Sequence, residues 1–188
     1  MEKSIRKWQL AGFFFTVIAG VIMHFVFDWT GQNAIVALVA PVNESIWEHI
    51  KLLFFPMLLF AWMEYRVWGE EYEQFWCIKL RGILLGSVLI PIIYYTYNGI
   101  FGKSADWINI VIFVVAVGIS YLVETKLFQN AAECSLNPER ALKFLFAIGI
   151  LFMVLTFFTP QIPFFQDPVT GTYGFSGAKK VNLLDKTE

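Results

Sequence analysis

Apolar residues occur along this chain in long runs, without the regular polar alternation of a soluble helix or strand. A helix needs about 20 mostly apolar residues to cross the hydrocarbon core of a bilayer. The pattern therefore predicts five transmembrane helices, over residues 8–27, 45–63, 82–98, 107–123 and 141–158. We expect an all-α membrane protein, a five-helix bundle whose first partner is the lipid bilayer.

A short apolar segment separates the first two predicted spans. Residues 34–42 are too few to cross a membrane, so we expect a re-entrant or interfacial segment there. Such a backbone is tolerated at membrane depth only where protein or water satisfies its polar groups. The alternative is that residues 34–42 belong to a sixth crossing, which would invert everything downstream.

The end of the chain differs from the rest. We predict a bundle over residues 1–160 and an irregular extracytoplasmic tail over residues 161–188. The first half of the tail is rich in Pro, Phe, Gly and Tyr, which favours an ordered loop packed on the bundle. The last part is polar, and we expect it to be mobile.

Charge supports a membrane location and suggests an orientation. Only 15% of the residues are charged, whereas soluble domains carry about a quarter. A net charge of −1 gives no basic face for nucleic acid. With the N-terminus inside, the inner segments hold nine Lys and Arg residues and the outer ones before the tail hold two. This bias predicts a cytoplasmic N-terminus and an extracytoplasmic C-terminus.

The two cysteines, Cys77 and Cys134, have neither metal-ligand spacing nor the pattern of a disulfide framework. Both fall on the predicted cytoplasmic side, where thiols are kept reduced. We therefore expect no disulfide.

The first span carries a regular series of small and polar residues. Gly12, Thr16, Gly20, His24 and Asp28 recur every four positions and so share one helix face. Small residues on such a face allow close approach of another helix. The series is either a packing seam that ends in two interfacial polar residues, or it leads to a His24–Asp28 pair that binds a ligand.

The stretch "PVNESIWEHIKL", residues 41–52, concentrates ionisable groups at the start of the second span. Ser45 and Glu48 fit a capping box, and acidic residues there complement the helix dipole. Capping does not account for His49. Because polar groups at membrane depth are costly, Asn43, Glu44, Glu48 and His49 are candidate ligand-binding residues.

His24 and His49 are the only histidines, and they fall at similar depth on adjacent predicted helices. Two further residues complete the candidate site. Tyr97 lies among tyrosines at the outer end of the third span, where an aromatic belt is the alternative. Asp167 enters the site if the tail folds over it.

Three motifs, "HFVFDWTGQN", "APVNESIWEHIKLLFFPML" and "DPVTGTYG", resemble those of a family of small multi-pass bacterial membrane proteins of unknown function. This resemblance covers most of the chain and implies a bacterial plasma membrane protein. His, Asp and Glu on membrane helices are also distantly similar to the alkaline ceramidase-like hydrolases. Those enzymes hold zinc with three histidines, whereas this chain has two.

The residues leave three functions open. The first is an outward-facing cavity that binds an ion or a small polar or lipid-linked ligand. The second is a metal-dependent hydrolase acting on a lipid. In it, His24, His49 and one carboxylate, Asp28 or alternatively Glu44 or Glu48, hold a divalent metal such as zinc, and a second carboxylate, Glu48 or Glu44, is the general base. The third is a structural or accessory role. Five spans without an inverted repeat do not make a complete transporter, so transport would require a homo-oligomer.

Overall fold

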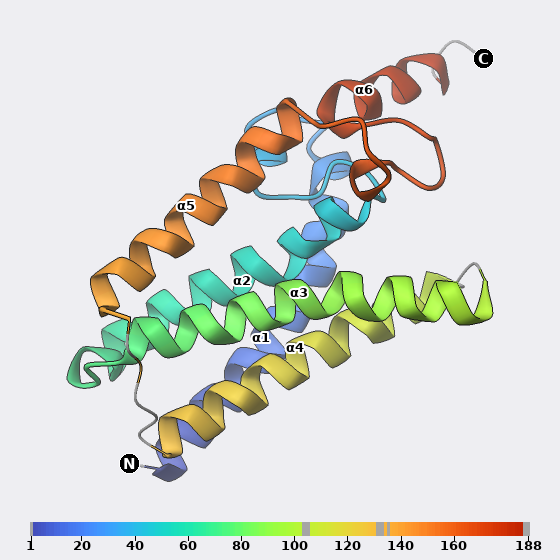
Figure 1. Ribbon diagram of the computed structural model, residues 1–188. Coiled ribbons are helices and arrows are strands. Elements are labelled where there is room, and N and C mark those ends of the chain that lie inside the picture. Colours follow the sequence, from blue (N-terminus) through green and yellow to red (C-terminus); the bar gives the residue numbers. More distant parts are fainter. Residues whose placement is uncertain (1, 103–105, 131–133, 135, 186–188) are drawn as a thin grey trace.

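The structure is a computed structural model that describes residues 2–102, 106–130, 134 and 136–185. Six α-helices and three short 3₁₀ helices follow one another along these residues (Figure 1). The α-helices are α1 Glu2–Trp29, α2 Ile46–Val67, α3 Phe75–Phe101, α4 Asp106–Gln129, α5 Pro138–Phe157 and α6 Gly174–Asp185. The 3₁₀ helices are η1 Val36–Leu38, η2 Gly69–Glu71 and η3 Pro163–Phe165.

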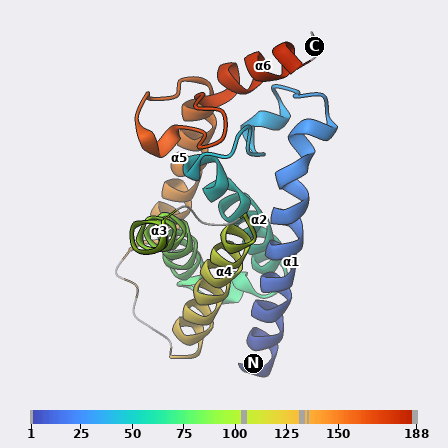
Figure 2. The ribbon, with the colours of Figure 1, turned by 90° about the vertical axis from the view of Figure 1, so that its right-hand side faces the viewer.

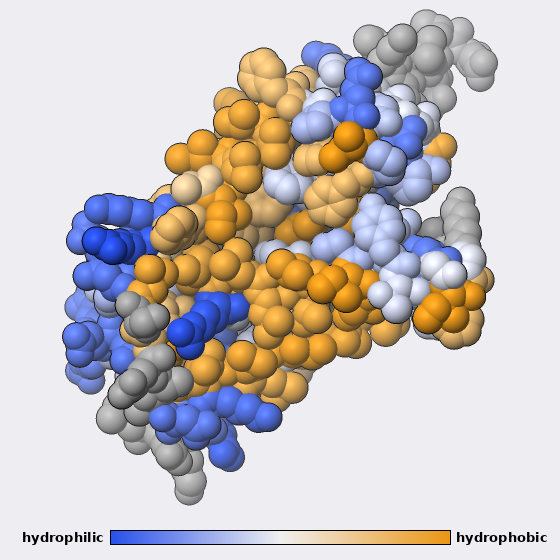
Figure 3. All heavy atoms as spheres, viewed as in Figure 1, coloured by the Kyte–Doolittle hydropathy of each residue, from blue (hydrophilic) through white to orange (hydrophobic). Residues whose placement is uncertain are grey.

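Within the described residues, five helices, α1 to α5, are long and apolar enough to cross a membrane. Hydrophobic side chains cover the middle of the bundle, and hydrophilic ones gather at its two ends (Figure 3). This arrangement confirms the predicted all-α membrane bundle of five helices. The protein is a multi-pass helical membrane protein.

The link between α1 and α2 does not cross the bundle. Its one regular piece is η1, three residues long, and the chain enters α2 at the end where it left α1 (Figures 1 and 2). A sixth crossing is therefore wrong. Ala37, Ala40 and Val42 of this link are buried together with Phe27 of α1. We call this end of the bundle the histidine end and the opposite one the N-terminal end.

The small residues of α1 face the neighbouring helices. Gly12, Thr16 and Gly20 are buried, and α1 packs against α2 and α4. A Cβ atom on Gly20 would lie 2.8 Å from the carbonyl oxygen of Leu52 and 2.5 Å from Cζ of Phe113. The glycine thus permits the close contact that places His24 beside α2.

A buried charged cluster lies at the N-terminal end. Lys79 forms ion pairs with Glu64 and with Glu124, the latter at 2.6 Å, and Gln9 Nε2 donates to Glu64 Oε1 at 2.8 Å. Sequence analysis placed Glu64, Lys79 and Glu124 just outside the spans because hydrophobic runs end at charged residues. The helices instead continue through them, since each charge finds a partner inside the bundle.

The cysteines correct another expectation. Cys77, at the start of α3, and Cys134, in the link between α4 and α5, form a disulfide with Cα atoms 6.2 Å apart. The expectation of two reduced cysteines is therefore wrong. Their spacing of 57 residues gave no local signal, because the pairing depends on how α3 and α4 pack.

The chain after α5 returns over the histidine end. Phe165 of η3 is buried, with its ring 4.8 Å from that of Trp47 in α2. Phe175 of α6 lies against Phe157 and Phe27, at 5.0 and 6.1 Å between ring centroids. These aromatic contacts hold the tail beside the start of α2. The tail is irregular only before Gly174, since its following residues form the helix α6, where an irregular and mobile segment was expected.

Candidate functional site

Two imidazoles and one carboxylate meet at the histidine end. Nε2 of His24 lies 3.6 Å from one oxygen of Glu44, and Nε2 of His49 lies 3.4 Å from the other. The two imidazole rings are 5.4 Å apart between centroids. We call these three residues the His-Glu-His cluster. Within the described part of the chain, they are the one group of three ionisable side chains with the geometry for a metal ion.

Local structure explains how the cluster forms. His24 lies about one turn before the end of α1, at the level where α2 begins. Ser45 caps α2 by accepting a hydrogen bond from the backbone N–H of Glu48 at 3.4 Å, which is one half of the predicted capping box. The other half is replaced, because the Ser45 N–H donates to Asn43 Oδ1 and the Glu48 carboxylate accepts from Val42. The cap places Glu44 just before the helix and His49 in its first turn, so both side chains reach toward α1.

A backbone contact fixes the tautomer of His49. Its Nδ1 lies 2.9 Å from the carbonyl oxygen of Ser45, and a carbonyl can only accept. Nδ1 is therefore the protonated nitrogen, which leaves the lone pair of Nε2 directed at the Glu44 carboxylate in a neutral ring. Two acceptors at 3.4 Å need a cation or a proton between them. A histidine held by a backbone carbonyl through its other nitrogen is the usual arrangement of a metal ligand.

Two distances within the cluster are near those expected around a tetrahedral metal, and they involve different oxygens of Glu44. Ligand atoms bound to zinc at 2.0–2.1 Å lie about 3.3 Å from one another. The two nitrogen–oxygen distances, 3.6 and 3.4 Å, are close to this value. All three ligand atoms lie within 4.8 Å of one another, so a small rotation of the side chains would complete the set. Three protein ligands leave a fourth position open.

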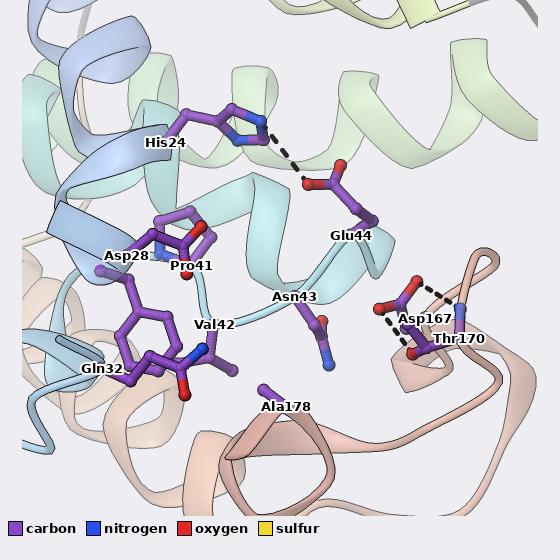
Figure 4. A pocket seen from close by; sticks show the side chains of 11 residues that line it. His24, Asp28, Gln32, Pro41, Val42, Asn43, Glu44, Asp167, Thr170 and Ala178 are labelled. Atoms are coloured by element: carbon purple, nitrogen blue, oxygen red, sulfur yellow. Dashed lines mark hydrogen bonds and ion pairs between the residues drawn. The ribbon is translucent and has the colours of Figure 1, made fainter. Parts of the chain in front are cut away.

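Three cavities meet at the cluster. A polar cavity of about 170 Å³ holds His24 and Glu44 together with Asp28, Asn43 and Asp167 (Figure 4). A mostly apolar cavity of about 370 Å³ opens between α1, α2 and α4. A third, of about 230 Å³, lies between α2, α3 and α4. Glu44 borders all three, and the tail residue Val169 borders both larger ones.

Glu48 lies outside this cluster. Its carboxylate pairs with Lys51 at 2.7 Å, accepts from Thr156 Oγ1 of α5 at 2.9 Å and from the backbone N–H of Val42 at 3.1 Å. Lys51 also donates to the carbonyl oxygens of Ala37 and Ala40. Both charged side chains are fully buried. Glu48 and Lys51 therefore connect α2 to α5 and to the link between α1 and α2.

The four remaining candidate residues lie outside the cluster, three of them on the wall of the polar cavity. Asp28 is exposed one turn beyond His24, on the wall of the polar cavity (Figure 4). Asn43 lines the same wall, and its Oδ1 accepts from the backbone N–H of Ser45. Asp167 also lines it, but its oxygens bind Val169 and Thr170 in a tight turn. Tyr97 lines none of the three cavities and stacks on Phe101 at 5.0 Å.

Two hydrogen-bond partners of the candidate residues could not be predicted from the sequence. The Ser45 carbonyl orients His49, and Thr156 holds Glu48 from 108 positions away. A backbone acceptor carries no residue-type signal, and Thr156 lies within an apolar run. The regular spacing of Gly12, Thr16 and Gly20 was the available signal for which face of α1 would bring His24 inward.

Comparison with known proteins identifies a family. Residues 1–175 match the family of unknown function DUF6512. The chain belongs to this family. The match includes all five long helices and the whole His-Glu-His cluster, so the site lies within the family's common region. No curated protein and no solved structure matches the chain.

Proposed function

We propose that the His-Glu-His cluster binds one divalent metal ion, with zinc as the ion its ligands suit best. The observation that carries the proposal is that Nε2 of His49 lies 3.4 Å from a Glu44 oxygen while its Nδ1 is held by the Ser45 carbonyl. A divalent cation between Nε2 and the carboxylate would form a coordinate bond with each, and His24 would supply the third. Two imidazoles and a carboxylate are a common ligand set of zinc enzymes.

The site is accessible. The side chains of His24 and Glu44 are 30% and 47% exposed, and that of His49 is 21% exposed. An ion can therefore enter from the polar cavity without opening the bundle. Bound there, it would keep one position for water or for a ligand atom.

Metal content of the purified protein tests this proposal. After dialysis against limiting zinc in a neutral detergent, we expect about one zinc per chain by elemental analysis. His49→Ala and Glu44→Gln should each lose most of it, because each removes one of three ligands. Asp28→Asn is the matched control, since it removes a charge from the same cavity but no ligand atom.

Equal zinc in the wild type and in His49→Ala would refute the metal site. The alternative outcome is a wild type that holds no zinc while nuclear magnetic resonance shows a protonated His49 imidazole at neutral pH. In that case a proton shared by His49 and Glu44, and not a metal, would explain their contact.

The apolar cavities suggest what the metal would do. We propose that it catalyses the hydrolysis of a lipid. An amphipathic lipid could place its chain between α1, α2 and α4 and its polar linkage at the cluster. A zinc-bound water has a pKa lowered toward neutrality and can attack an ester or amide carbonyl. Asp28, the carboxylate left free on the cavity wall, would accept the water proton and return it to the leaving group.

Lipid hydrolysis is measured with ester and amide lipids in mixed micelles. The wild type should release fatty acid, and both a chelator and Glu44→Gln should stop the release. Asp28→Asn should keep its zinc but lose most activity. Product release unaffected by the chelator would remove the metal from the reaction.

Charge bias and the resemblance of the motifs support a location for this chemistry. We propose the plasma membrane of a bacterium, with the histidine end facing outward.

A further inference from the structure

A separate groove lies at the N-terminal end of the bundle, between α1 and α4. Its cavity measures about 580 Å³, and its walls are apolar along Leu10, Phe13 and Leu122. Leu10 and Leu122 are exposed, so this part of the groove opens toward the lipid. It is remote from the His-Glu-His cluster, because the cluster lies where α1 ends and α2 begins.

Two basic residues stand at the mouth of this groove. Arg6 of α1 and Lys126 of α4 both line the cavity and are both exposed. The nearby carboxylates of Glu64 and Glu124 are buried in ion pairs with Lys79. Among the described residues, no ion pair engages Arg6 or Lys126, so their charges are free to attract an anion.

A buried donor also points to a missing ligand atom. Nε2 of Gln129, at the end of α4 in the lining of the groove, is buried and has no hydrogen-bond partner among the described residues. An unpaired buried donor costs about 1–3 kcal/mol, which a bound acceptor would remove. Because Arg6 and Lys126 line the same groove, we expect this acceptor to belong to a negatively charged group.

We propose that the groove between α1 and α4 binds one anionic phospholipid. Its phosphate lies at Arg6 and Lys126 and accepts from Gln129, and one acyl chain lies along Leu10, Phe13 and Leu122. Arginine binds phosphate oxygens through two parallel N–H groups, and lysine adds a point charge. An apolar groove that leads away from paired cations fits a molecule with both an anionic head and a hydrocarbon chain. A free phosphate would use only the mouth.

Lipid binding is measured by native mass spectrometry of the full chain in a neutral detergent. We expect dioleoyl phosphatidylglycerol to bind about tenfold more tightly than dioleoyl phosphatidylcholine, because two basic residues attract the anionic head. The double variant Arg6→Gln/Lys126→Gln should abolish this preference. Arg81→Gln, a change at another exposed basic residue, is the control and should keep it.

Gly118 provides a second, independent variant. A Cβ atom there would meet only Phe13, at 3.6 Å, so a larger side chain can enter the groove without disturbing the bundle. Gly118→Leu should weaken phosphatidylglycerol binding while both basic residues remain. Equal affinity of the double variant and the wild type for phosphatidylglycerol would overturn the proposal. Inorganic phosphate that binds as tightly as the lipid would overturn it too, because the groove would then contribute nothing.

Discussion

Glu44 and Glu48 are four positions apart, yet their carboxylates have different surroundings. Glu44 is half exposed between two imidazoles, whereas Glu48 is buried against Lys51 and Thr156. Exposure leaves Glu44 accessible to the proposed metal ion. Burial and three polar contacts, with Lys51, Thr156 and the backbone of Val42, give Glu48 a structural role. A change at either residue should therefore affect a different measurable property.

Lys51→Met tests the structural role of this buried pair. The substitution leaves the Glu48 carboxylate buried without its cation, which should destabilise the protein by about 3–5 kcal/mol. The double variant Glu48→Gln/Lys51→Met removes both charges and should recover part of that loss. Thermal unfolding in detergent gives the order of the three proteins. Loss of zinc binding by Lys51→Met at unchanged stability would instead place Lys51 in the site.

At the scale of helices, the position of α1 depends on one close contact. Gly20 lies against the backbone of Leu52 and the ring of Phe113, one turn before His24. Any side chain at this position pushes α1 away from α2 and α4. The distance between His24 and Glu44 would grow with that displacement, so we expect the affinity of the proposed metal site to depend on this packing contact.

Gly20→Ala should lower the midpoint of thermal unfolding and weaken zinc binding, since overpacking a tight contact costs about 1–3 kcal/mol. Gly99→Ala in α3 is the control, because its Cβ would have nothing within 4 Å. Alanine there favours the helix slightly, so stability should hold or rise. Zinc affinity can be followed by competition with a fluorescent chelator. Equal stability of Gly20→Ala and the wild type would show that α1 can shift freely.

Sequence alone predicted the helices better than the contacts between them. Long apolar runs indicated five spans, because crossing the bilayer requires them. The ends of the spans were less predictable, since Lys79 is buried only by virtue of Glu64 and Glu124 on other helices. Within the site, the depths of His24 and His49 followed from helix lengths. Which carboxylate joins them depends on the turn before α2, and that turn is set by distant partners of Glu48.

At the scale of the whole molecule, the two ends of the bundle have different chemistry. The histidine end carries an accessible ligand set beside open cavities, and the N-terminal end carries a buried charged cluster and a groove with a basic mouth. Apolar surface separates them (Figure 3). In a membrane, the His-Glu-His cluster and the groove between α1 and α4 would therefore lie in different leaflets.

Orientation decides which leaflet each site meets. Nine basic residues against two predict that the N-terminal end is cytoplasmic, whereas the disulfide between Cys77 and Cys134 at that end is typical of an oxidising compartment. We expect the charge bias to prevail, because it acts during insertion, before the cysteines can pair. A reporter that folds only outside the cytoplasm should be active on the C-terminus. Activity only when it is fused to the N-terminus would reverse the orientation.

Binding of one metal ion by His24, Glu44 and His49 is the proposal on which the other predictions for the histidine end depend. X-ray absorption at the zinc edge of the zinc-loaded protein tests it most directly, because the spectrum reports ligand types and bond lengths. We expect two imidazole nitrogens and carboxylate or water oxygens at about 2.0–2.1 Å, with one imidazole lost in His49→Ala. A shell of six oxygens, or a spectrum that His49→Ala leaves unchanged, would contradict it.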